Sequence, residues 1–281
     1  MRLGGSILRS YNDPHEWIQI VKELRYSAVL APVGHDAPDE LVKAYVEEAK
    51  KAGVVIAEVG AWSNPVSKDE EERKKALEYC KKQLDLADRI GARCCVNIAG
   101  SRGEIWDGFY RDNYSEDTYA LIVDSVREII DDVKPKNTFY TLEPMPWMYP
   151  DSPDSYLRLI KDIDRKEFGV HLDFVNMINS PQKYLFNDKF IKECFDKLGP
   201  YIKSIHAKDV IMENRFTTII REVAPGKGTI DYAVFLRLVE DLDPDMPVLI
   251  EHLDTQEEYI EAFDYIKTVA DRNNIKIKPV L

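Results

Sequence analysis

Long apolar runs are missing from this sequence, since no stretch approaches the roughly 20 consecutive apolar residues that a membrane-spanning helix needs. Residues 1–8 also lack the long apolar segment of a secretory signal, and their composition favours a first strand. From these two absences we expect a soluble, cytoplasmic protein without a membrane partner.

Cysteine is scarce as well, with four residues in a chain of 281. Four cysteines do not make a disulfide framework at this length. Cys94 and Cys95 are adjacent on a predicted strand, so their side chains should point to opposite faces. We therefore expect free, buried thiols.

Positive charge is in deficit, because 38 lysines and arginines face 50 acidic residues and leave a net charge of -12. Nucleic-acid binding depends on neutralising phosphates with basic side chains. The charge balance thus argues against a nucleic-acid partner. Small uncharged or metal-chelating molecules suit such a protein better.

What the sequence does contain is a regular alternation of short apolar strands and amphipathic helices. Eight strands are predicted, at residues 3–8, 27–32, 54–59, 93–98, 139–143, 168–173, 201–209 and 247–251. Each precedes a predicted helix, at residues 14–25, 39–51, 68–90, 115–133, 152–163, 231–242 and 255–273, and residues 181–198 are predicted as a loop followed by a helix. Residues 100–114 and 211–228 are predicted as long loops, the second irregular.

Alternating units of this kind indicate the α/β class with a parallel sheet, and eight is the number that closes into a (β/α)8 TIM barrel. A doubly wound open sheet is the alternative. No linker or low-complexity segment divides the chain. We expect a single domain over residues 1–281.

Four of the predicted strands end in a residue that can bind a hard metal ion, and these are Glu143, Asp173, His206 and Glu251. Alternation along each strand places all four on the inward face, where the carboxyl ends of barrel strands converge. Three carboxylates at a dry barrel mouth would repel one another unless a cation lies among them. One imidazole and three carboxylates suit a single divalent ion, with Mn2+ favoured and Mg2+, Co2+ or Zn2+ as alternatives.

Further residues are candidates for contacts with a substrate at this mouth. Lys208 shares the parity of His206 and could bind a substrate oxygen, or could be a solvated strand-end lysine. His171 lies two residues before Asp173 on the same face, where it could orient that ligand or be a core histidine. Trp62, Trp106 and Trp147 lie in loops after three strands, where they could stack on a sugar or simply pack in the core.

Five segments carry a resemblance to a known family. They are Leu142-Glu143-Pro144, His171-Leu172-Asp173, Ile205-His206-Ala207-Lys208-Asp209, the turn from Pro225 to Asp231, and Ile250-Glu251. With the eight units, they resemble the sugar phosphate isomerase/epimerase family and its xylose isomerase-like TIM barrel. The resemblance implies that the four strand-end residues bind one divalent ion, that Glu143 and Glu251 exchange a substrate proton, and that the 225–231 turn is structural.

The chain departs from the ketose 3-epimerase branch of that family. Asn176 stands where the branch has a histidine, and Met212 where it has an arginine, although Arg215 lies nearby. Both Asn176 and Arg215 are candidates for substrate contact. The family also contains an apurinic-site endonuclease branch, which binds a zinc cluster through many histidines. This chain has only five histidines, and its acidic net charge would repel DNA, so the sequence argues against that branch.

The expected function is a metal-dependent isomerase or epimerase of a small carbohydrate, which moves a proton next to a carbonyl through an enediolate. A lyase is the alternative, since the same enediolate could expel a leaving group from a 3-keto-sugar or a C-glycoside. A non-catalytic sugar-binding protein is a third reading, which the paired glutamates argue against. The substrate, the reacting carbon and the formation of a homo-oligomer stay open.

Overall fold

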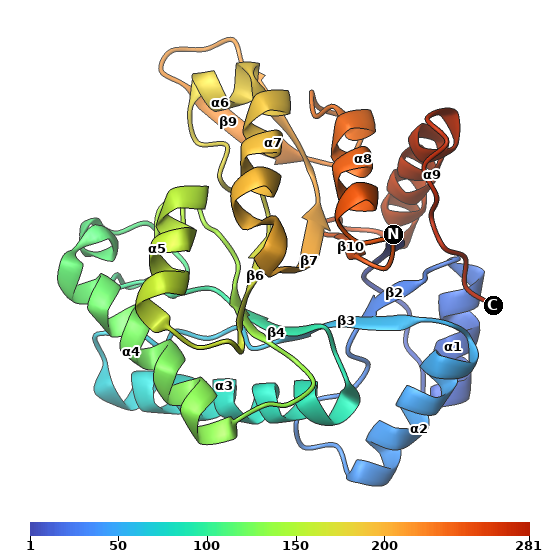
Figure 1. The fold of residues 1–281 in the computed structure, drawn as a ribbon, viewed down its shortest axis with the longest axis horizontal. Helices are drawn as coiled ribbons and strands as arrows, with labels where there is room; N and C mark the ends of the chain where they lie inside the picture. The colour runs from blue at the N-terminus through green and yellow to red at the C-terminus, as the bar shows by residue number, and fades with distance from the viewer.

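Eight parallel strands close into a barrel in this computed structural model, which describes residues 1–281 (Figure 1). The barrel strands are β1 (Arg2–Gly5), β2 (Ala28–Leu30), β3 (Val55–Gly60), β4 (Cys94–Asn97), β5 (Tyr140–Leu142), β6 (Phe168–Leu172), β7 (Ile202–Ala207) and β10 (Pro247–Ile250). The ring closes because β1 pairs with both β2 and β10. The predicted (β/α)8 TIM barrel is therefore confirmed, and the open sheet is excluded.

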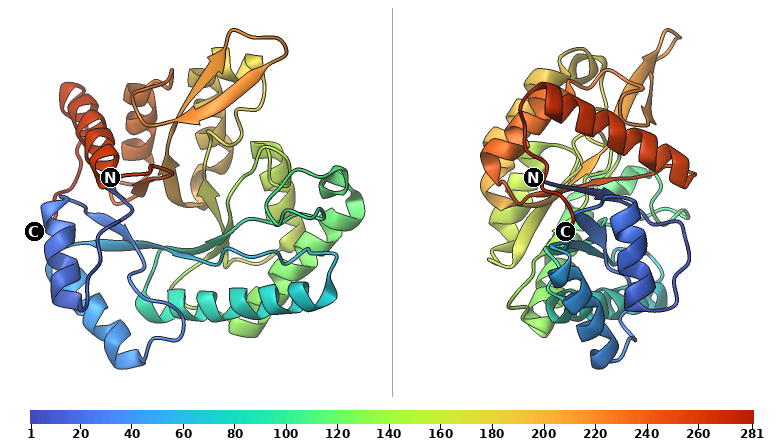
Figure 2. Two further views of the ribbon diagram at one scale, coloured as in Figure 1. Left: turned by 180° about the vertical axis from the view of Figure 1, so that it is seen from behind. Right: turned by 90° about the vertical axis from the view of Figure 1, so that its right-hand side faces the viewer.

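Helices surround this barrel (Figure 2). They are α1 (Pro14–Glu23), α2 (Asp39–Lys51), α3 (Glu70–Ile90), α4 (Glu116–Val133), α5 (Pro153–Ile163), α6 (Pro181–Leu185), α7 (Asn187–Leu198), α8 (Tyr232–Leu242) and α9 (Gln256–Arg272). Two short 3-10 turns cover Arg111–Tyr114 and Gly199–Tyr201. None of the helices is long and apolar enough to cross a membrane.

Local sequence signals begin and end several of these helices. The Asp13 side chain accepts a hydrogen bond from the backbone of Glu16 at the start of α1. Gly91 takes a left-handed conformation at the end of α3. Thr255 and Glu258 form a capping box at the start of α9. These caps explain why the predicted helix boundaries lie close to the observed ones.

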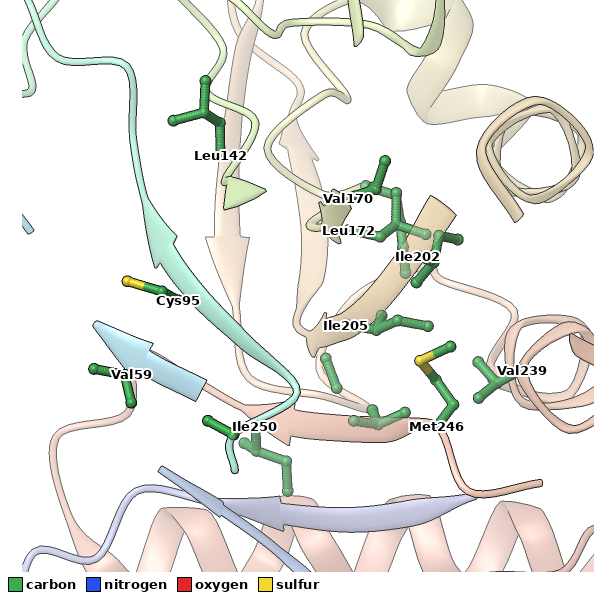
Figure 3. Packing of buried hydrophobic residues seen from close by; sticks show 14 of the residues in the cluster. Val59, Cys95, Leu142, Val170, Leu172, Ile202, Ile205, Val239, Met246 and Ile250 are labelled. Atoms are coloured by element: carbon green, nitrogen blue, oxygen red, sulfur yellow. The ribbon is translucent and has the colours of Figure 1, made fainter. Parts of the chain in front are cut away.

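The main core lies between the barrel and its helices. Figure 3 shows Leu172 and Ile205 from β6 and β7 in the same cluster as Val239 from α8. Leu142 and Ile250, which alternation also predicts to face the helices, belong to this cluster. All four cysteines are free and buried, as predicted. The alternate residues of each strand, which include the polar ones, therefore face the interior of the barrel.

The predicted irregular loop at residues 211–228 is wrong in part, because it holds most of an antiparallel hairpin. The hairpin consists of β8 (Asp209–Glu213) and β9 (Ile219–Val223), and Figure 1 shows it projecting beyond the barrel. The predicted seventh strand, residues 201–209, is accordingly split between β7 and β8. Residues 214–218 lack the Asn-Gly or Asp-Gly pair that marks a tight hairpin, so the turn gave no signal.

Candidate active site

The barrel brings the four predicted metal ligands together. Glu143, Asp173 and Glu251 directly follow β5, β6 and β10, and His206 lies in β7. One ligand atom from each lies within 4.8 Å of those of the others. His206 Nδ1 is 2.9 Å from Glu251 Oε2, 3.5 Å from Glu143 Oε1 and 3.8 Å from Asp173 Oδ2. The cluster forms because parallel strands in register end at the same edge.

Lys208 lies inside this cluster instead of being a solvated lysine at the mouth. Its Nζ is 2.7 Å from Asp173 Oδ2, 2.8 Å from Glu251 Oε2 and 3.6 Å from Glu143 Oε1. The side chain is fully buried and does not line the cavity above the cluster. In this structure Lys208 is therefore a counter-ion for the carboxylates, and its contact with a substrate oxygen stays a prediction.

The charges and donor atoms of the cluster fit a divalent cation. Three carboxylates and one ammonium leave two negative charges in a buried place, which one divalent ion would balance. Asp173 Oδ2, His206 Nδ1 and Glu251 Oε2 are buried, and apart from their ion pairs with Lys208 and with one another they have no hydrogen-bond partner. Such atoms are costly unless something else binds them. Glu143, Asp173, His206 and Glu251 are the residues that would hold the ion.

Glu58 completes the site, and sequence reasoning missed it. This fully buried residue of β3 places Oε2 3.2 Å from His206 Nε2 and Oε1 3.4 Å from His171 Nδ1. Burial acts to raise the pKa of Glu58, but the two histidines outweigh it and hold that pKa below its ordinary value. The available signal was a carboxylate in the middle of an apolar strand, which requires a buried partner.

Two residues predicted to contact a substrate, His171 and Arg215, do not line the cavity. His171 is completely buried, and its Nδ1 lies 2.7 Å from Ser204 Oγ, so it contacts the barrel interior and not the cavity. Arg215 lies in the turn of the projecting hairpin, where its side chain is 74% exposed and 3.6 Å from Glu213. The hairpin places Thr218, Ile220, Arg221 and Glu222 along the cavity but not Arg215.

A cavity of about 760 Å³ opens above the carboxylates. Glu143, Glu251 and Asn176 line it together with the predicted aromatic residues Trp62, Trp106 and Trp147. The Asn176 amide donates hydrogen bonds to Glu143 Oε1 at 3.0 Å and to the Pro144 carbonyl at 3.1 Å. Asn176 therefore touches both the cavity and a proposed ligand. The roles of these residues in binding stay predictions.

A family model described as xylose isomerase-like TIM barrel matches residues 17–269. The chain belongs to the xylose isomerase-like TIM barrel family. An uncharacterised protein of Methanocaldococcus jannaschii, MJ1311, is 23% identical over 227 residues, which cover 76% of this chain and 71% of that protein.

Solved structures show the same fold as this xylose isomerase-like barrel. A xylose isomerase-like TIM barrel protein of Mycobacterium smegmatis, in complex with magnesium, has a TM-score of 0.67 and 19% identity, covering 93% of this chain and 90% of the other. The 3-keto-D-glucoside 4-epimerase of E. coli has a TM-score of 0.67 and 16% identity, covering 95% and 99%. At these identities the likeness shows the fold alone.

The two glutamates that line the cavity, Glu143 and Glu251, differ in their electrostatics. Burial and the charge of Glu251 raise the pKa of Glu143 above its ordinary value. Burial also acts to raise the pKa of Glu251, but His206 and Lys208 outweigh it and hold that pKa low. Two carboxyl groups pushed in opposite directions can act as one acid and one base.

Proposed function

We propose that this chain is a divalent-metal-dependent isomerase or epimerase that transfers a proton next to the carbonyl of a sugar, with residues 1–281 as one domain. The observation that carries the proposal is the pair Glu143 and Glu251, which line one cavity with oppositely shifted pKa values. Similar folds among sugar epimerases, such as the 3-keto-D-glucoside 4-epimerase of E. coli, support it.

Different residues of the chain have different roles in this reaction. One of Glu143 and Glu251 removes the carbon-bound proton, and the other returns a proton from the opposite side. Asp173 and His206 have ligand roles without proton transfer. A bound ion, with Mn2+ favoured, would supply positive charge to the substrate oxygens. Asn176 holds the Glu143 carboxylate in place.

A lyase is the second candidate, because elimination begins with removal of the same proton. A probable 3-DHS dehydratase of Bacillus anthracis has a TM-score of 0.68 and 17% identity to this chain, covering 95% of it and 96% of the other. In this chain the same glutamate pair would serve, with a leaving group expelled in place of the second proton transfer. Product analysis separates the two, since only elimination yields an unsaturated product.

Deuterium exchange tests the proposal before the substrate is identified. With a keto sugar in heavy water, the wild type should place deuterium on the carbon next to the carbonyl. Glu143→Gln and Glu251→Gln keep the side-chain size but remove the base, so each should stop exchange at the proton it handles. Glu167→Gln, just before β6 at the opposite end of the barrel, is the control. Wild-type exchange in both active-site variants would refute the two-glutamate mechanism.

Metal content tests the ligand assignment separately. Asp173→Ala and His206→Ala should each lower metal occupancy and activity together, because each removes one proposed ligand from the cluster. Elemental analysis after dialysis measures the occupancy, and His15→Ala on the exposed side of α1 is the control. Full occupancy in the His206→Ala protein would remove His206 from the site.

A further inference from the structure

The β8–β9 hairpin places a fourth carboxylate beside the candidate metal site. Glu222 lies in β9 opposite Val210 of β8, so the strand pairing brings it back beside Lys208, which lies two residues before Val210. Glu222 and Val210 both line the cavity. Glu222 Oε2 lies 3.5 Å from Lys208 Nζ. A charged group from the predicted loop at residues 211–228 therefore reaches the site.

A second contact holds the Glu222 carboxylate in this position. His252 Nδ1 lies 3.1 Å from Glu222 Oε1 and 3.2 Å from Oε2, and His252 Nε2 lies 3.4 Å from Glu251 Oε2. Glu222 is not one of the four residues whose ligand atoms converge. It therefore faces Lys208 from the edge of the cluster without being a proposed ligand.

Lys208 occupies the oxygen atoms that a divalent ion would need. Its Nζ lies 2.7 Å from Asp173 Oδ2 and 2.8 Å from Glu251 Oε2. The same two oxygens face His206 Nδ1, at 3.8 and 2.9 Å. An ammonium and a divalent cation that share these buried oxygens would repel each other strongly. Binding of the ion therefore requires the ammonium to withdraw, and a buried ammonium without a carboxylate partner is costly.

Glu222 is the carboxylate that can take over the ammonium. Four carboxylates form ion pairs with Lys208, and the other three belong to proposed ligands. A shift of about 0.7 Å would bring Lys208 Nζ from 3.5 Å to the distance of a charge-assisted hydrogen bond with Glu222 Oε2. A small movement thus frees the ligand oxygens and keeps the ammonium paired.

We propose that Glu222 is a positioning residue for the metal site, which accepts the Lys208 ammonium when a divalent ion binds Asp173 and Glu251. This role rests on the proposed function only for the presence of the ion. Because Glu222 belongs to β9, occupancy of the metal site also ties the hairpin more closely to the barrel beside the cavity.

A double-mutant cycle on Mn2+ affinity tests the proposal without turnover. Glu222→Gln should weaken Mn2+ binding about tenfold, the lower end of the effects known for residues that support metal ligands. The same substitution in the Lys208→Met protein should change the affinity by less than about twofold, because no ammonium is left to accommodate. Competition with a chromophoric chelator measures the four affinities, at a temperature where circular dichroism shows every variant folded.

Glu213→Gln is the matched control, since Glu213 is a carboxylate of the same hairpin that pairs with Arg221 at 3.2 Å and does not line the cavity. It should bind Mn2+ as the wild type does. Equal losses from Glu222→Gln with and without Lys208 would overturn the proposal, because they would assign the effect to direct attraction between Glu222 and the ion. Unchanged affinity in Glu222→Gln would overturn it as well.

Hydrogen exchange of the backbone amides gives a second test that does not depend on the Lys208→Met protein. Mn2+ should slow exchange in β8 and β9 of the wild type and of Glu213→Gln, because Lys208 then holds the hairpin through Glu222. In Glu222→Gln the ion should leave this exchange near its metal-free rate. A wild-type hairpin whose exchange does not respond to Mn2+ would contradict the proposed role.

These outcomes are separable from those that test the proposed function. Mn2+ affinity that is unaffected by Glu222→Gln, with deuterium transfer lost in Glu143→Gln and Glu251→Gln, refutes the role of Glu222 alone. The expected cycle, with deuterium transfer unaffected in both of those variants, refutes the two-glutamate mechanism alone.

Discussion

Glu58 Oε2 lies 3.2 Å from His206 Nε2, while the other ring nitrogen, Nδ1, faces Glu143, Asp173 and Glu251. A hydrogen bond donated from Nε2 to a carboxylate leaves Nδ1 with a free lone pair directed at the proposed metal position. Carboxylates that orient metal-binding histidines in this way also raise the basicity of the ring. Glu58 is therefore placed to orient the His206 ring without touching the cavity.

The first prediction is that Glu58→Ala lowers Mn2+ affinity by about 10- to 100-fold, because the His206 ring loses its orientation. Glu58→Gln keeps an oxygen that can accept the Nε2–H bond, so it should recover much of the affinity. Competition with a chromophoric chelator measures the affinity. Nitrogen-15 NMR of the imidazole should show a protonated Nε2 in the wild type and in Glu58→Gln.

Thr141→Val is the matched control, since Thr141 is buried on β5 and donates to the Cys95 carbonyl without contacting the cluster. It should bind Mn2+ as the wild type does. Wild-type affinity in Glu58→Ala would show that the Glu58–His206 contact has no part in metal binding.

The second prediction concerns Lys208, which partly balances the carboxylates. Lys208→Met should lower the stability of the metal-free protein by about 3 to 5 kcal/mol, the usual effect of removing one partner from a buried ion pair. Mn2+ should then raise the melting temperature more than in the wild type, because the ion no longer shares the carboxylates with an ammonium. Thermal unfolding in chelator and in Mn2+ measures both effects.

Lys203→Met serves as control for the loss of a half-buried lysine elsewhere. Lys203 Nζ lies 4.0 Å from the centre of the Phe139 ring, away from the carboxylates. Its metal-induced shift should match that of the wild type. An unchanged shift in Lys208→Met would mean that Lys208 does not compete with the ion.

The sequence allowed the barrel and the ligand cluster to be predicted because both depend on simple periodicity. Alternation along a strand decides the face of Glu143 or Asp173, and parallel strands in register bring the ends together. The contact between Glu58 and His206 depends instead on closure of the barrel, which places β3 across from β7. No spacing along the chain reports such a contact between residues 148 positions apart.

The position of Lys208 depended on where a strand stops. Parity correctly put it on the face of His206, but β7 ends at Ala207 and the hairpin begins at Asp209. The same hairpin places Arg215 in the exposed turn between β8 and β9. The turn at 225–231, expected to be structural, surrounds Asp209, whose Oδ2 accepts from the Gly226 N–H at 3.0 Å. A Cβ on Gly228 would lie 2.2 Å from Asp209 Oδ1, so that close approach requires glycine.

The last prediction concerns the seam between the two ends of the chain, where Asp245 contacts Arg2 and Lys278. The hydrogen bond from Lys278, aided by Arg2 and opposed by burial, lowers the pKa of Asp245 from 3.8 to about 2. A carboxyl group with a lowered pKa adds stability that is complete above its unfolded pKa and is lost as the pH falls toward the folded one. Because Asp245 is 39% exposed, solvent screening limits this contribution to about 1 kcal/mol or less.

Asp245→Asn should therefore be less stable than the wild type near neutral pH, and the difference should shrink as the pH falls below about 4. Urea unfolding at a series of pH values measures the free energy of both proteins. Asp36→Asn, an exposed aspartate without an ion pair, should differ little from the wild type throughout. A difference for Asp245→Asn that stays constant into acid would assign its effect to packing or hydrogen bonding of the neutral side chain, because only an ionised carboxylate gains from Lys278 and Arg2.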